Sequence, residues 1–137
     1  MQATDRIDFK GIELMESLQF LCEQLKLLGI PYEFGEWTSE LSYPYFVGEL
    51  TEDAIETEDG AETSTFILTG THKGSYLDLS KLNKKIKKHF DPIYGLRDST
   101  EAGSIDVFWD GAFFVPTNVA DLKRIQINLQ IKEWKGR

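Results

Sequence analysis

The chain has 137 residues, of which 41% are hydrophobic and 12% aromatic, and its formal net charge is −8. This length predicts a single domain over residues 1–137, and the composition excludes disordered and collagen-like chains. The negative charge argues against general affinity for nucleic acid, because phosphate binding needs clustered Lys and Arg.

The region from Phe9 to Leu28 has the clearest helical pattern. Its leucines recur every three or four residues and form one apolar stripe: Leu14, Leu18, Leu21, Leu25 and Leu28. Asp8 is expected to be the N-cap and Gly29 the C′ residue of this helix. Phe20, Cys22 and Leu27 widen the stripe. The pattern therefore predicts a broadly buried helix in which Cys22 is a core residue and not a nucleophile.

Neither a membrane span nor a secretion signal is expected. The leucine-rich stretch is interrupted by Glu16, Glu23 and Lys26. Residues 1–10 carry acids and lack the apolar segment of a signal peptide. The single cysteine can form no intrachain disulfide and no multi-cysteine metal site. A cytosolic compartment is therefore predicted.

Three strands are predicted next, over Tyr32–Trp37, Pro44–Leu50 and Thr63–Thr71. A proline is allowed at the first residue of a strand. The acidic stretch Glu49–Glu62 separates the second and third strands, and it contains seven acids and no base. Its Asp59-Gly60 pair is typical of a hairpin turn.

The second half of the chain predicts one helix and three strands. The helix covers Leu77–Phe90, and its last turn contains His89, where a protonated imidazole would suit the helix dipole. A loop with Gly and Ser follows. The strand Ser104–Trp109 is expected to turn at Asp110-Gly111 and return as Ala112–Val115. Residues 122–134 then alternate regularly between apolar and polar side chains, as a half-buried strand does.

These elements predict an α+β fold. An antiparallel or mixed β-sheet of about six strands is expected, with two helices packed on one face, because short hairpin-type links favour neighbouring antiparallel strands. The other face of the sheet would be polar or available to a partner.

No pattern of residues indicates catalysis or a bound cofactor. Glycines do not stand at phosphate-loop spacing, and the two histidines, His72 and His89, are far apart in sequence and lack an acid cluster at metal-ligand spacing. Four acids of the acidic stretch could in principle bind a divalent cation, but they do not match the calcium-loop pattern: Asp53, Glu56, Glu58 and Asp59. We therefore expect no enzyme, no cofactor and no metal site.

A set of aromatic residues around the first two strands is larger than one small core requires. Aromatic side chains with a polar group are favoured where a surface meets a partner, although the core is the alternative for each of them. Together with the acidic stretch they form the candidate subunit or partner interface: Trp37, Tyr43, Tyr45, Glu52, Asp53, Glu56, Glu58 and Asp59.

The charge is unevenly divided along the chain. Residues 1–70 hold 15 acids and 3 bases, whereas residues 71–137 hold 8 acids and 12 bases. This polarity suits head-to-tail self-association, in which one face meets the opposite face of a neighbour. The alternative is a folded domain whose surface charges fall unevenly.

The segments Tyr32-Glu33-Phe34-Gly35-Glu36-Trp37 and Tyr43-Pro44-Tyr45-Phe46-Val47-Gly48-Glu49 resemble small tail-completion proteins of long-tailed bacteriophages and prophages. These are proteins of the tail terminator or head-to-tail joining class. The similarity covers residues 11–135 in the order of elements, and its specific part is these two motifs. The resemblance transfers no functional residue.

The resemblance implies a non-enzymatic virion subunit. Such proteins form a ring, commonly a hexamer, that caps the tail tube and presents a surface to the head connector, and DNA later passes through the ring. Assembly would take place in the host cytoplasm. Three alternatives remain open: a head-completion (neck) protein, an acidic monomeric adaptor that binds a basic protein, and a metal-dependent enzyme.

Overall fold

The computed structural model of the chain describes residues 9–52, 60–100 and 103–135. These residues form two helices and six strands. In chain order they are α1 (Phe9–Leu27), β1 (Tyr32–Phe34), β2 (Tyr45–Glu52), β3 (Glu62–His72), α2 (Tyr76–His89), β4 (Leu96–Thr100), β5 (Gly103–Phe114) and β6 (Lys123–Lys135).

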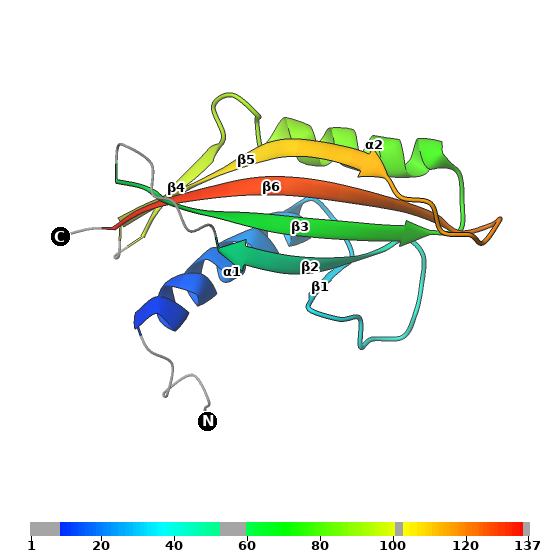
Figure 1. Ribbon diagram of the computed structural model, residues 1–137, viewed down its shortest axis with the longest axis horizontal. Coiled ribbons are helices and arrows are strands. Elements are labelled where there is room, and N and C mark those ends of the chain that lie inside the picture. The colour runs from blue at the N-terminus through cyan, green and yellow to red at the C-terminus, as the bar shows by residue number, and fades with distance from the viewer. Residues whose placement is uncertain (1–8, 53–59, 101–102, 136–137) are drawn as a thin grey trace.

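The six strands form one mixed sheet in the order β1-β2-β3-β6-β5-β4. The short strand β1 pairs in parallel with β2, and all other neighbours are antiparallel. Both helices lie behind the sheet in the view of Figure 1, so its other face is turned toward the reader. The fold is therefore α+β with both helices on one face, as the sequence predicts.

The core lies between the sheet and the helices. The central strands β3 and β6 alternate, so that every second residue points to the helices, and Phe66 and Leu68 lie opposite Leu129 and Ile127. The helices close this layer with fully buried side chains, two from each: Leu21, Leu25, Leu79 and Ile86. Burial of each such side chain contributes about 1.5–3 kcal/mol to folding.

Glycine is required at two places in the sheet because aromatic rings lie on the backbone there. A Cβ atom on Gly70 would stand 2.2 Å from a ring carbon of Phe46, and one on Gly48 would stand 2.4 Å from a ring carbon of Phe66. Both glycines are buried and face the helices. The two large rings fill the space that a side chain at either glycine would occupy.

The prediction of a hairpin at Asp110-Gly111 is wrong. Strand β5 runs continuously through this pair, and its register against β6 shifts between Trp109 and Ala112. The pair forms a β-bulge in which Gly111 has φ +125°. A bulge and a tight turn both favour a glycine with positive φ, so the local signal is the same.

Strand β4 lies where the sequence indicated only a loop. Its five residues, Leu-Arg-Asp-Ser-Thr, are mostly polar and carry no regular alternation. β4 pairs with β5 and forms one edge of the sheet. Edge strands are commonly short and polar, which explains why the pattern did not reveal it.

The prediction that Cys22 is a core residue is also wrong, because Cys22 is exposed. Leu27, which was expected to widen the buried stripe, is 75% exposed. The buried face of α1 is centred on Leu21 and Leu25, and Cys22 lies about 100° around the helix from Leu21. The buried stripe is therefore narrower than predicted, and it includes the polar Ser17, whose hydroxyl donates to Glu133 of β6 at 2.5 Å.

His89, for which a protonated role at the end of α2 is predicted, contacts the other helix. Its Nε2 lies 2.7 Å from Oε1 of Gln24 on α1, and partial burial lowers the pKa of the imidazole. A lowered pKa disfavours the protonated form. The residue therefore joins the two helices.

The remaining differences concern the ends of elements. β1 stops at Phe34, three residues earlier than predicted, because Gly35 adopts φ +84° and donates its N–H to Gly48 at 2.8 Å. Gly29 has φ +75°, as expected of a C′ residue. The predicted N-cap Asp8 and turn residue Asp59 lie outside the described residues.

Candidate interaction surfaces

The charge division of the sequence becomes a division of the sheet. Strands β1, β2 and β3 come from residues 32–72, and the chain contains no Lys or Arg between Leu27 and His72. The other half-sheet, β6-β5-β4, is accompanied by α2, which carries five exposed lysines: Lys81, Lys84, Lys85, Lys87 and Lys88. One margin of the molecule is therefore acidic and the opposite margin is basic.

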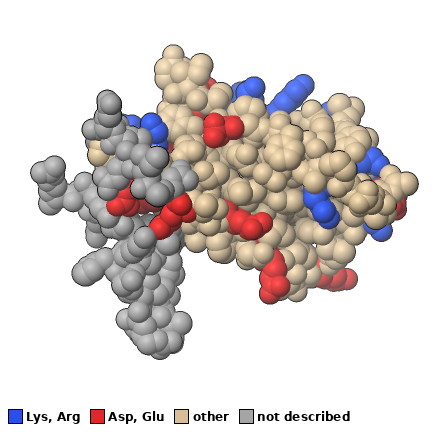
Figure 2. Space-filling model, viewed as in Figure 1, with Lys and Arg blue, Asp and Glu red and all other residues tan. Residues whose placement is uncertain are grey.

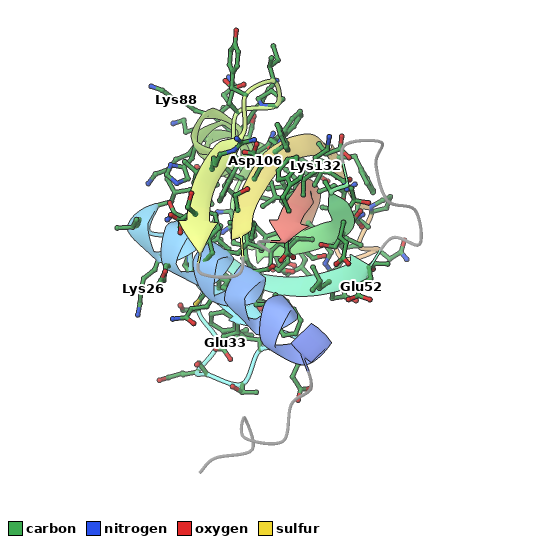
Figure 3. The ribbon with its side chains drawn as sticks, turned by 90° about the vertical axis from the view of Figure 1, so that its left-hand side faces the viewer. Lys26, Glu33, Glu52, Lys88, Asp106 and Lys132 are labelled. Carbon is green, nitrogen blue, oxygen red and sulfur yellow. The ribbon has the colours of Figure 1, made fainter. Side chains whose placement is uncertain are left out.

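The two margins are visible in the figures. In Figure 2 the acidic side chains gather mainly over the lower part of the open sheet face, and the basic ones gather mainly along the top and right. Figure 3 places Lys88 toward the top of the molecule and Glu33 toward the bottom, with Lys26 and Glu52 at similar heights between them. The lysines of α2 and the carboxylate of Glu33 thus lie on different sides of one subunit.

A cluster of aromatic rings forms at the start of β2. The ring of Trp37 lies 5.2 Å from that of Tyr45, and the ring of Tyr43 lies 5.7 Å from Tyr45 on the other side. The ammonium group of Lys73 stands 5.2 Å from the centre of the Tyr43 ring. All three rings are partly exposed. The cluster therefore offers polar and apolar contact area to a partner.

The loop that carries Trp37 is held by one carboxylate. Glu33 accepts hydrogen bonds from the backbone N–H and hydroxyl of Thr38, at 3.0 and 2.7 Å, and from the N–H of Ser39 at 3.2 Å. A hydrogen bond from the Ser39 side chain and the bonds from Thr38 favour the ionised form and lower the pKa of Glu33 to about 2. The loop after β1 is thus ordered by its own residues.

The structure separates the residues of the predicted interface. Trp37 and Tyr43 join Tyr45 at the first end of β2, but Glu52 lies at the last residue of the same strand. At the usual rise per residue these two ends are about 23 Å apart. The other four predicted interface residues, Asp53, Glu56, Glu58 and Asp59, lie outside the described residues. The aromatic cluster and Glu52 therefore belong to two surfaces.

A further apolar surface lies at the N-terminal end of α2, and sequence analysis did not single it out. Its members are between 46% and 62% exposed: Tyr76, Leu77 and Phe114. The rings of Tyr76 and Phe114 meet edge to face at 4.7 Å. The available signal was the pair Phe113-Phe114. Because consecutive strand residues point to opposite faces, Phe113 points to the open face, and Phe114 lies on the helix side against Tyr76.

One ion pair is embedded in the open face of the sheet. Oδ2 of Asp106 on β5 lies 2.9 Å from the guanidinium group of Arg97 on β4, and the Asp106 side chain is only 4% exposed. Its other oxygen is buried and has no hydrogen-bond partner within the described part of the chain. The guanidinium group also stands 5.2 Å from the centre of the Trp134 ring. The pair fixes β4 to the sheet at this point.

The described residues contain no cluster of three or more His, Cys, Asp or Glu side chains that could hold a metal ion. Among the same residues, no helix has both the length and the hydropathy that crossing a membrane requires.

A scan against protein-family models finds no match to the chain, and no curated protein matches it. Function must therefore be argued from the surfaces themselves.

Proposed function

We propose that this chain is a non-enzymatic structural subunit of the tail terminator or head-to-tail joining type. In this role several copies, six in the commonest arrangement, form a ring that caps a phage tail tube and connects it to the head. The finished particle would contain the protein in its tail, after assembly in the cytoplasm of the bacterial host. DNA would only pass through the opening of the ring.

The observation that carries the proposal is the placement of unlike charges on opposite margins of one sheet. A ring is built from heterologous contacts, in which a surface of one subunit meets a different surface of the next. Acidic β1 and β2 on one side and the lysines of α2 on the other supply such a pair of unlike surfaces. The resemblance of the segments Tyr32–Trp37 and Tyr43–Glu49 to tail-completion proteins supports the same conclusion.

The ends of the strands suit contacts along the axis of a tail. The exposed rings of Tyr76 and Phe114 and the aromatic cluster around Tyr45 lie toward the same end of the sheet, because β2 begins where β3 and β5 finish. Aromatic residues are enriched in protein interfaces. We assign this end to the contact with the tail tube protein or the head connector.

Tube growth in the presence of the purified chain tests this function. The tail tube protein of the same virus is polymerised with and without the chain, and tube lengths are measured by electron microscopy. We expect the chain to bind at one tube end as a ring and to stop elongation. Unchanged tube lengths and the absence of density at the tube ends would contradict the proposal. A stable monomer that instead binds a basic protein would favour the adaptor alternative.

A further inference from the structure

The loop between α2 and β4 presents two apolar side chains to water. Tyr94 is 81% exposed, the highest value of any large hydrophobic side chain within the described residues, and Ile93 is 75% exposed, as is Leu27. Single exposed apolar residues are ordinary on protein surfaces. Here, however, two stand side by side in a turn whose backbone is fixed.

The turn is fixed by Asp91. Its carboxylate accepts hydrogen bonds from the N–H groups of Ile93 and Tyr94 at 2.8 and 2.9 Å, and its carbonyl accepts the N–H of Gly95 at 2.8 Å. Gly95 closes the turn with φ +70° and packs closely on Asp106 and Phe108 of β5. The two side chains are therefore held outward before any partner arrives, which lowers the entropy cost of binding.

The opposite margin of the molecule has a matching composition. Phe34, the last residue of β1, is 48% exposed, and Leu41 in the following loop is 52% exposed. Exposed carboxylates from Glu36 and Glu40 lie in the same loop. This margin is thus apolar and acidic, whereas the turn at Ile93 lies next to the lysines at the end of α2.

We propose that the turn Ile93-Tyr94, together with the lysine face of α2, docks on the loop around Phe34 and Leu41 of a second copy of this chain. Charge complementarity selects this occupant, because α2 carries five lysines and one acid, Asp78, at the end far from the turn, whereas the loop around Phe34 and Leu41 contains Glu36 and Glu40 and no base. The carboxylate of Asp91 in the turn accepts backbone N–H groups. Since the two surfaces differ and lie on opposite margins, each copy can bind one neighbour on each side.

This inference rests on the proposed function, since it names the contact that would build the ring. It can nevertheless fail or succeed separately. A ring held together by other surfaces would leave the function standing and remove the inference. A chain that associates through these margins but does not stop tube growth would leave the inference standing and contradict the proposed function.

Two variants test the contact, each with one margin changed. The first carries Ile93→Ser and Tyr94→Ser, which keep the backbone bonds to Asp91, and the second carries Phe34→Ser and Leu41→Ser. Phe113→Ser is the matched control, since Phe113 is 52% exposed and belongs to neither margin. Circular dichroism and thermal melting establish that every variant folds. Sedimentation equilibrium then measures self-association.

We expect each double variant to associate at least tenfold more weakly than the wild type, and the control to match the wild type. An equimolar mixture of the two double variants is expected to form a heterodimer and nothing larger, because one intact margin of each kind remains. Self-association of the first variant equal to that of the wild type would overturn the proposal. So would a mixture that stays monomeric, or a wild-type chain that stays monomeric at every concentration measured.

A charge exchange provides a second test. Lys84→Glu with Lys88→Glu and, separately, Glu36→Lys with Glu40→Lys should each weaken self-association, and the mixture of the two variants should regain it, because an opposite-charge pair of margins is re-created. Equal weakening by Lys132→Glu, which changes a lysine on β6 in the middle of the sheet, would show a general charge effect and would contradict the assignment to these margins.

Discussion

Single carboxylates that accept backbone N–H groups order both loops at the margins of the sheet. Glu33 holds the loop after β1, and Asp91 holds the turn before β4. In both residues these hydrogen bonds lower the pKa, since they favour the ionised carboxylate. The side chains that carry the proposed contact are therefore positioned by residues that do not themselves belong to the core.

This arrangement predicts how stability depends on pH. The pKa of Glu33 is about 2 in the folded chain against an ordinary value of 4.5. A lowered folded-state pKa contributes stability that is complete above the unfolded value and is lost as the pH falls toward the folded value. Replacing Glu33 by Gln should therefore flatten the decrease of the melting temperature between about pH 5 and about pH 2.

Thermal melts of the wild type and of the Glu33→Gln variant over this range check the prediction. Glu36→Gln, an exposed change in the same loop, serves as the control and should keep the wild-type slope. Parallel curves for Glu33→Gln and the wild type would mean that the bonds to Thr38 and Ser39 do not govern the titration.

At the scale of the elements, the contact between β2 and β3 depends on glycines beneath aromatic rings. Gly70→Ala would place a methyl group against the Phe46 ring, and overpacking of this kind costs about 1–3 kcal/mol of unfolding free energy. Thr69→Ala changes the next residue, on the open face, and should cost less than about 1 kcal/mol. Urea denaturation of both variants measures the difference. Equal costs would show that Phe46 moves aside without strain.

The elements that sequence analysis identified are those whose side chains repeat with a clear period. The alternation of Ile125, Ile127, Leu129 and Ile131 fixes β6, and the leucine spacing fixes α1. Strand β4 and the bulge at Asp110-Gly111 escaped because long-range pairing with β5 and β6 creates them. Of the residues of the predicted interface, the structure brings the rings of Trp37, Tyr43 and Tyr45 together. The distance of these rings from Glu52 depends on the length of β2, which a local pattern does not give.

At the scale of the whole molecule, the opposed margins predict that association depends on salt. Screening shortens the reach of exposed charges from about 14 Å at 0.05 M to about 4 Å at 0.5 M monovalent salt. We therefore expect self-association, followed by light scattering, to weaken several-fold over this range. Association that strengthens with salt would mean that apolar contacts, such as that of Ile93 and Tyr94, dominate and that the charges act only in orientation.

The exposed position of Cys22 on α1 has a practical consequence. It is the only thiol in the chain, and it faces solvent. In air, two copies can become covalently linked through it, so oligomer measurements need a reducing agent. The same atom accepts a single maleimide dye per copy, and energy transfer between donor- and acceptor-labelled chains would then report how neighbouring copies are oriented.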